Sequence, residues 1–83
     1  MKLIYFAWVR ERIGVAEEDI DLPAEVKTAG DLLHWLRKRG DGYAEALQDP
    51  KVIRVAVNQE HVAHGEPIGG AREIALFPPM TGG

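Results

Sequence analysis

The N-terminal stretch of the chain has an apolar pattern that predicts a buried β-strand. Residues 2–8 place apolar or aromatic side chains at both alternating sets of positions, as in a strand covered on both faces. After a helical turn at 9–13, the alternating Ile20 and Leu22 predict a second, half-exposed strand, and the charged residues 17–19 are typical of a solvated sheet edge. We expect the two strands to pair as a wide hairpin, with the first strand at the centre of the sheet.

One amphipathic helix is predicted from Thr28 to about Arg39. Thr28 can cap the first amides, Asp31 adds negative charge near the N-terminus, and Gly40 can end the helix. The apolar positions follow the i, i+3, i+4, i+7 spacing of one buried stripe, formed by Ala29, Leu32, Leu33 and Leu36. This stripe should cover one face of a sheet. The pattern also allows a second, short helix over 43–48.

The C-terminal half of the chain alternates short strands with turns. A β-branched run over 52–57 predicts a strand, followed by a turn and a short return strand from Val62. Glycines and a proline between 65 and 70 then indicate a loop. The last strand runs over 73–77 and must end at Pro78-Pro79, because proline cannot donate a ladder hydrogen bond.

This order of elements predicts one domain of the α+β class. A single main helix cannot connect several parallel strand pairs, so we expect a mixed sheet of four to five strands with that helix packed on one face. A β-grasp arrangement satisfies this order, with the first and last strands adjacent and parallel at the centre. We assign residues 1–77 to the domain and residues 78–83 to an extended, flexible C-terminal tail.

The composition narrows the chemistry available to the chain. It has 83 residues, with 10 basic and 13 acidic side chains in no long runs, so neither nucleic acid nor a membrane is an expected partner. We find no apolar run long enough to span a membrane and no secretion signal, and therefore expect a cytoplasmic protein. Cysteine and serine are absent, which leaves as side-chain hydroxyls only Tyr5, Thr28, Tyr43 and Thr81. Covalent chemistry by side chains is therefore not expected.

Two other features have a functional and a simpler interpretation. His61 and His64 suggest a metal site, but a spacing of three on an extended segment points their side chains to opposite faces, and further ligands are lacking nearby. We therefore expect no bound metal. Trp8 can pack in the core or at its boundary, or it can contact a partner, and packing is the favoured interpretation.

The residues after the last strand carry the clearest functional signal. Two prolines favour an extended start, and six residues at roughly 3 Å each can reach about 18 Å from the domain, enough to enter another protein's active site. Gly82 and Gly83 have no side chains, so the terminal carboxylate can pass through a narrow channel. That carboxylate becomes reactive once it is activated, for example as an anhydride with AMP. A frayed chain end is the simpler alternative.

The tail also resembles that of a known family. Phe77-Pro78-Pro79-Met80-Thr81-Gly82-Gly83 is similar to the Phe-Pro-Pro-x-Ser/Thr-Gly-Gly ending of molybdopterin synthase small subunits. Further matches cover nearly the whole chain: Tyr5-Phe6-Ala7 with Val9-Arg10-Glu11, the helix beginning at Thr28, Ala56-Val57-Asn58-Gln59, and Glu73-Ile74-Ala75. The resemblance implies a ubiquitin-like β-grasp fold.

The resemblance further implies a sulfur carrier for molybdenum cofactor biosynthesis. An ATP-dependent activating enzyme would adenylate Gly83, and a sulfurtransferase system would convert it to a thiocarboxylate. The tail would then enter the large subunit of molybdopterin synthase and give its sulfur to cyclic pyranopterin monophosphate. On this view Gly83 is the reacting group, the chain binds no cofactor of its own, and two small subunits assemble on a large-subunit dimer. Partner contacts would come from the rest of the tail: Phe77, Pro78, Pro79, Met80, Thr81 and Gly82.

Two departures from the family and three alternatives stay open. Family members place an acidic turn where this chain has Gly69-Gly70-Ala71-Arg72, which puts the charge contacts of that loop in doubt, and Met80 replaces a smaller β-branched residue. The same Gly-Gly end suits a thiamin-pathway sulfur carrier, or a ubiquitin-like modifier that joins Gly83 to lysines. A plain binding module, using an exposed sheet or edge strand, would not need the tail.

Overall fold

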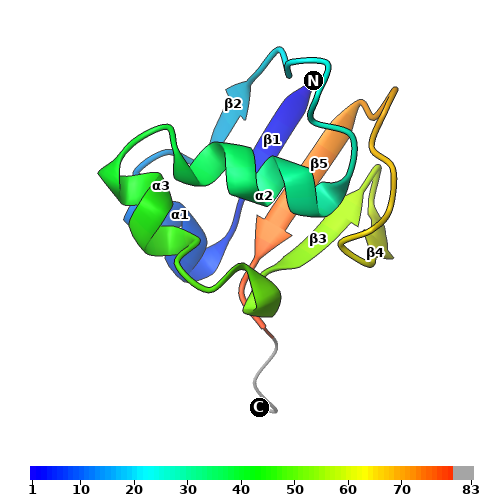
Figure 1. The fold of residues 1–83 in the computed structure, drawn as a ribbon. Helices are drawn as coiled ribbons and strands as arrows, with labels where there is room; N and C mark the ends of the chain where they lie inside the picture. The colour runs from blue at the N-terminus through cyan, green and yellow to red at the C-terminus, as the bar shows by residue number, and fades with distance from the viewer. Residues whose placement is uncertain (80–83) are drawn as a thin grey trace.

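Within residues 1–79, five short strands and three helices make up the fold (Figure 1). The computed structural model describes residues 1–79. In chain order the elements are β1 (Lys2–Tyr5), α1 (Ala7–Ile13), β2 (Glu17–Asp19), α2 (Ala29–Arg37), α3 (Asp41–Ala46), a 3₁₀ turn η1 (Pro50–Val52), β3 (Arg54–Val57), β4 (Glu60–Val62) and β5 (Glu73–Phe77).

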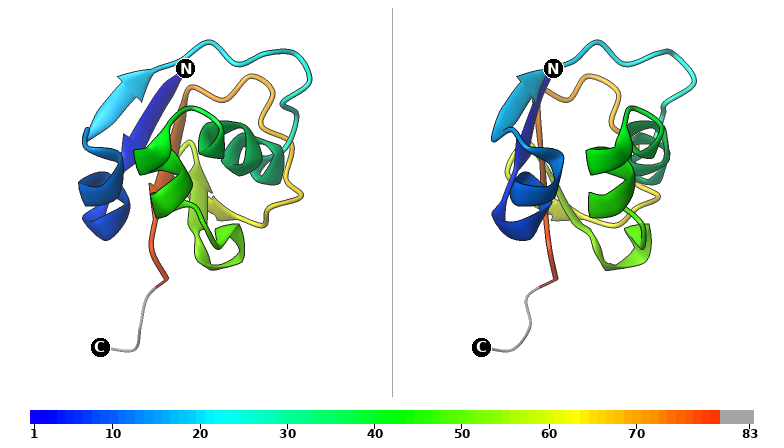
Figure 2. Two further views of the ribbon diagram at one scale, coloured as in Figure 1. Left: turned by 60° about the vertical axis from the view of Figure 1, so that its left-hand side comes forward. Right: turned by 90° about the vertical axis from the view of Figure 1, so that its left-hand side faces the viewer.

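The strands form one mixed sheet in the order β2-β1-β5-β3-β4. β1 and β5 are parallel neighbours at its centre, and the other pairings are antiparallel. Figure 2 shows α2 and α3 on one side of the sheet. The predicted α+β class and β-grasp arrangement are therefore confirmed, with five strands and one main helix packed on one face. Because β1 and β5 run in the same direction, the residues that follow each of them meet at one end of the sheet.

Helix α2 begins where its sequence predicts. Asp31 N donates to Thr28 Oγ1 over 3.1 Å, and Thr28 N donates to Asp31 Oδ2 over 3.2 Å, which completes a capping box. Two further amides at this end donate to a distant loop, Ala29 N to the Glu66 carbonyl and Gly30 N to the His64 carbonyl. The helix ends at Arg37, earlier than the predicted Arg39.

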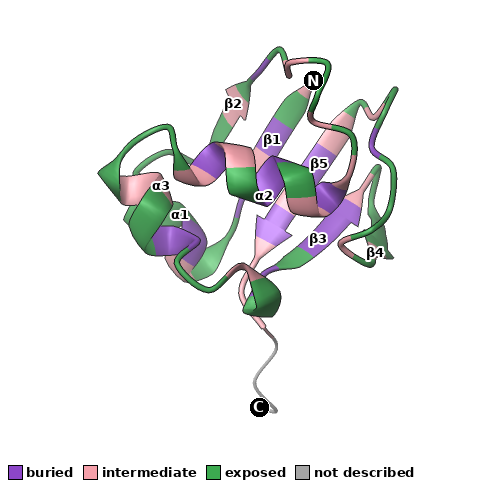
Figure 3. Cartoon of the chain, viewed as in Figure 1, coloured by how far each residue is buried: buried purple, intermediate pink, exposed green. Residues whose placement is uncertain are grey.

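The hydrophobic core lies between α2 and the sheet (Figure 3). The stripe predicted on α2 is wholly buried, and it faces the inward positions of β1, β3 and β5. The largest fully buried side chains are Tyr5, Leu3, Leu32, Leu33, Leu36, Leu47, Ile53, Ile74, Leu76, Val9 and Val55. The opposite face of the sheet, which we call the outer face, contributes none of the fully buried bulky side chains.

The first strand is shorter than predicted. β1 ends at Tyr5, Phe6 caps the next helix in extended conformation, and Ala7 turns into α1 with a φ of 52°. Trp8 therefore belongs to α1 and not to the strand. It is half-buried against the core, and the guanidinium carbon of Arg12 lies 4.3 Å from its ring centroid. Packing is thus the role that the structure shows for Trp8. The predicted second strand is also displaced, to Glu17–Asp19.

A two-residue turn joins β3 to β4. Asn58 and Gln59 have φ angles of 48° and 73°, as in the type I′ turn that fits the twist of a hairpin. The side-chain oxygen of Asn58 accepts hydrogen bonds from Arg72 N at 3.0 Å and Glu73 N at 3.1 Å. In this chain, then, a side chain of the hairpin turn binds the backbone at the end of the Gly69-Gly70-Ala71-Arg72 loop.

Candidate functional site

The tail leaves the domain at the end of β5. Phe77 is the last residue of the strand, and Pro78 and Pro79 follow it as half-buried, non-regular backbone. The remaining predicted site residues lie outside the described residues, namely Met80, Thr81, Gly82 and Gly83. Their roles stay predictions. What the structure does show is the surface of the domain from which they depart.

Aromatic side chains from three separate parts of the chain gather at this exit. The Phe77 ring centroid lies 6.2 Å from that of Phe6 and 5.0 Å from that of His61, both in edge-to-face geometry. Phe6 follows β1, His61 lies in β4 and Phe77 ends β5. We call these three residues the tail-exit cluster. Phe6 is 45% exposed, although large apolar side chains are normally covered, so the cluster offers an apolar contact surface.

One side of the exit is an apolar hollow. It has a volume of about 410 Å³ and is lined by Phe6, Ala7, Phe77, Pro78 and Pro79. No charged or hydrogen-bonding side chain is among these residues. The hollow can therefore receive an apolar group of another protein, but it offers no polar group with which to hold or orient a small polar substrate.

The other side of the exit is cationic. Arg54 begins β3 directly opposite Phe77 in the antiparallel register, and both Arg54 and Lys51 are exposed. The two residues line a shallow groove of about 390 Å³ that also includes Pro79. A partner that takes the tail thus meets apolar surface on one side and positive charge on the other.

The hydroxyl groups of the described residues serve the fold. Tyr5 Oη and Tyr43 Oη donate to one oxygen of Glu18, over 2.7 Å and 2.6 Å, and Thr28 Oγ1 caps α2. Arg39 completes the arrangement with an ion pair to Glu18 at 3.3 Å. Burial, followed by the hydrogen bond to Glu18, raises the pKa of Tyr5 far above its ordinary value. None of these groups is set up as a nucleophile.

The two histidines of the β4 region point apart, as predicted. His61 joins the tail-exit cluster, whereas His64 Nε2 donates to the Ile53 carbonyl over 2.8 Å. Within residues 1–79, no group of three or more His, Cys, Asp or Glu side chains could hold a metal ion. Across the same described part of the chain, no helix is long and apolar enough to cross a membrane.

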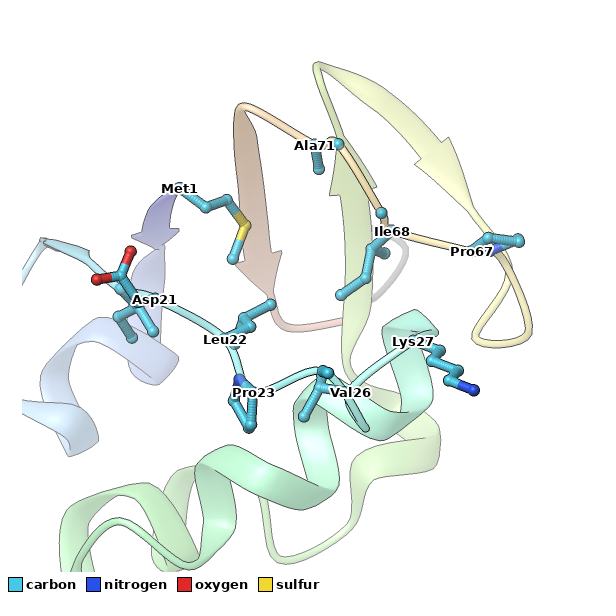
Figure 4. A pocket seen from close by; sticks show the side chains of 13 residues that line it. Met1, Asp21, Leu22, Pro23, Val26, Lys27, Pro67, Ile68 and Ala71 are labelled. Atoms are coloured by element: carbon cyan, nitrogen blue, oxygen red, sulfur yellow. The ribbon is translucent and has the colours of Figure 1, made fainter.

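Another hollow lies at the opposite end of the sheet (Figure 4). It has a volume of about 580 Å³, and Met1, Leu22, Val26 and Ile68 point toward it from the segments before β1, after β2 and before β5. These segments adjoin the N-terminal ends of the two central strands, whereas the tail leaves from the C-terminal end of β5. This hollow is therefore remote from the tail.

Two members of the site are not predicted from the sequence. The apolar pattern places Phe6 in a buried strand, and the histidine spacing suggests His61 only as a metal ligand. A signal for Phe6 exists, because the expected parallel pairing of the first and last strands already places it beside Phe77. His61 depends on the register of β4 against β3, where it pairs with Ala56. No local pattern in the sequence predicts how β4 is aligned against β3.

Known proteins match this chain over nearly all of its length. The ThiS family matches residues 3–83. The molybdopterin synthase sulfur carrier subunit of Escherichia coli is 36% identical over 83 residues, covering 100% of this chain and 99% of that protein. Its counterpart from Haemophilus influenzae is 37% identical over 83 residues, with the same coverage.

A solved structure extends the likeness to the fold. The small archaeal modifier protein 1 of Haloferax volcanii superposes with a TM-score of 0.71 at 30% identity, covering 96% of this chain and 97% of that one. The family match includes the tail and spans nearly the entire domain. The chain therefore belongs to the ThiS family, together with the molybdopterin synthase sulfur carrier subunits that it resembles over nearly their whole length.

Proposed function

We propose that the chain is a sulfur carrier for molybdenum cofactor biosynthesis whose working group is the carboxylate of Gly83. The observation that carries this proposal is the match to sulfur carrier subunits of molybdopterin synthase across the whole chain, Gly-Gly end included. The structure adds support, because β5 ends at Phe77, and Pro78 and Pro79 follow it outside the ladder. Among the described side chains, moreover, the hydroxyls are already used in structural hydrogen bonds.

The proposed cycle uses the terminal carboxylate as an acyl group. One carboxylate oxygen of Gly83 attacks the α-phosphate of ATP in an activating enzyme, and pyrophosphate leaves. A persulfide on a sulfurtransferase then displaces AMP to give an acyl disulfide. A second thiol cleaves its S–S bond, which leaves a disulfide on the sulfurtransferase system and the thiocarboxylate on Gly83. Transfer of that sulfur to cyclic pyranopterin monophosphate, with water supplying the oxygen that replaces it on the acyl carbon, returns the carboxylate, so the chain is reloaded with each turn. The chain binds no cofactor of its own, and the activating enzyme uses the ATP.

The large subunit of molybdopterin synthase is the proposed acceptor of the tail. In this assembly Phe77, Pro78 and Pro79 orient the tail, and the apolar hollow beside them contacts the large subunit. A side chain of that partner can fill the hollow, which removes the exposed face of Phe6 from water. A heterotetramer of two small subunits on a large-subunit dimer is the expected assembly.

Intact-mass analysis tests the carrier chemistry. The protein is incubated with the activating enzyme of its own organism, ATP and a sulfur donor. The expected result is the mass increase of one sulfur replacing one oxygen, confined to the C-terminal peptide. A variant lacking Gly83 is the control and should gain nothing. If the intact chain gains no sulfur with an activating enzyme that loads another carrier, the proposal is wrong.

The Haloferax volcanii structure favours a second candidate function. Its name, small archaeal modifier protein 1, describes a protein that modifies others, and it shares this fold. On that alternative, an activated Gly83 is attached to lysine amines of other proteins. Digestion and mass spectrometry of cellular proteins would then find many lysines carrying the Gly-Gly end of this chain. Their absence from cells in which the chain is thiocarboxylated favours the carrier alone.

A further inference from the structure

We propose that His61 makes the docking of the large subunit at the tail exit dependent on pH, with only the neutral imidazole fitting the interface. This inference rests on the proposed function, because it assumes the large subunit as the partner. It goes further because it assigns the pH dependence of binding to a residue outside the tail.

His61 lies beside Phe77 at the tail exit. The residue is exposed, lies in β4 opposite Ala56 of β3, and turns its ring edge-to-face against Phe77 at 5.0 Å. Its strand belongs to the sheet, whose outer face is free of α2 and α3 (Figure 2). Any protein that covers Phe77 as it takes the tail must also cover or border this ring.

The described neighbours of His61 in its row on β3 and β5 carry no charge. Across the outer face its row continues with Ala56, Ala75 and Ile4, and it ends at Glu17 of β2, whose carboxylate is paired with Lys2. The residues of β3 and β5 in this row therefore have no side-chain group that could hydrogen-bond to the His61 ring. Among residues 1–79, no side-chain hydrogen bond or ion pair involves His61.

Charged side chains on β3, β4 and β5 lie at other levels of the sheet or on its other face. Arg54 of β3 lies two positions from Ala56 on the same face and would repel an imidazolium. Glu73 of β5 lies two positions from Ala75 on that face, opposite Lys2 of β1. Lys2 also forms an ion pair with Glu17 at 2.9 Å. Glu60, next to His61 in β4, alternates to the other face.

The sign of the pH effect follows from these neighbours. A neutral imidazole can be buried against aromatic rings at little cost. A protonated one would lose its water, gain no counter-charge from β3 or β5 at its own level, and lie near Arg54. Association is therefore stronger at neutral pH and above, and it weakens in acid.

Calorimetric titration with the cognate large subunit tests the proposal. The dissociation constant of the full chain is measured at about pH 7.5 and about pH 5.5 at constant ionic strength, and we expect about tenfold weaker binding at the lower pH. His61→Leu should remove that difference, and His61→Gln is a second variant in case the first is poorly folded. His34→Gln, on the exposed side of α2, is the matched control and should keep it.

The outcomes separate this inference from the function on which it rests. Equal binding of the unmodified chain at both pH values overturns the role of His61, and so does an unchanged pH effect in both His61 variants. In either case the carrier proposal stands, because the large subunit still binds. If the chain fails to bind the large subunit at both pH values, the proposed partnership is wrong and the inference falls with it.

Discussion

Side chains from three other elements or loops meet at the carboxylate of Glu18 in β2, although that strand lies at the sheet edge. Tyr5 comes from β1, Arg39 from the segment after α2, and Tyr43 from α3. The Glu18 side chain is 19% exposed, so these contacts are partly shielded from water. Burial by itself would raise the pKa of Glu18, but the hydrogen bonds from Tyr43 and Tyr5, together with Arg39, hold it below its ordinary value.

The lowered pKa of Glu18 predicts an acid-sensitive fold. A carboxyl whose pKa is depressed in the folded state adds stability above its ordinary value of 4.5, and that stability is lost as pH falls through the lower, folded value. Glu18→Gln should cost about 1–2 kcal/mol at neutral pH. It should also flatten the loss of stability below pH 4.5, as measured by urea unfolding across pH. Glu11→Gln, on the exposed side of α1, is the control and should leave both unchanged.

The turn at Gln59 offers a stabilising substitution. With a φ of 73°, Gln59 holds a left-handed conformation that costs a side-chain-bearing residue about 1 kcal/mol relative to glycine. Gln59→Gly should therefore raise the free energy of unfolding by about 1 kcal/mol, and it creates the Asn-Gly pair that type I′ turns prefer. Gln59→Ala keeps the strain and should give no such gain in the same thermal or urea unfolding measurement.

At the scale of elements, α1 and α3 touch through a glycine. A Cβ at Gly42 would lie 2.7 Å from the Arg12 carbonyl oxygen, so no larger residue fits without movement of one helix. We expect Gly42→Ala to lower the free energy of unfolding by about 1–3 kcal/mol. Gly65→Ala is the matched control, because a Cβ there meets nothing within 4 Å and should change stability by less than about 0.5 kcal/mol. Equal stability of the two variants would contradict the tight contact.

The bounds of strands and helices are predictable where the sequence contains residues that start or stop an element, such as prolines and helix caps. β5 has the predicted bounds because Pro78 cannot continue a ladder, and α2 begins as predicted because Thr28 and Asp31 form a capping box. The end of β1 is not predictable in this way. Residues 2–8 alternate like a strand, and the left-handed turn at Ala7 that starts α1 uses a residue with no preference for that conformation.

The candidate site is only partly readable from the sequence. The tail stands out by its composition, so the order of residues alone is enough to single out Phe77, Pro78 and Pro79. The neighbours of Phe77 come instead from the residue after β1 and from β4, and both strands join the sheet through long-range pairing. Such pairing is decided by the packing of the whole sheet, and a local pattern cannot report it.

At the scale of the whole molecule, the two ends of the sheet differ in a way that can be tested. Phe77→Ala removes the centre of the tail-exit cluster and should weaken binding to the large subunit by about tenfold or more, as for an aromatic anchor. Leu22→Ala trims an apolar side chain at the opposite end and should leave that affinity unchanged. Both are measured by titration calorimetry after circular dichroism confirms folding. Unchanged affinity in a folded Phe77→Ala protein would count against the docking surface.

The parallel pairing of β1 and β5 also decides how the domain bears mechanical load. A pull on the carboxyl end runs along β5, which is held on one side by β1 and on the other by β3. Their hydrogen bonds lie across the direction of the pull, so they are strained together in shear and are not opened one by one. Force that withdraws the tail from a deep channel would thus drag the intact domain behind it, without unravelling its last strand.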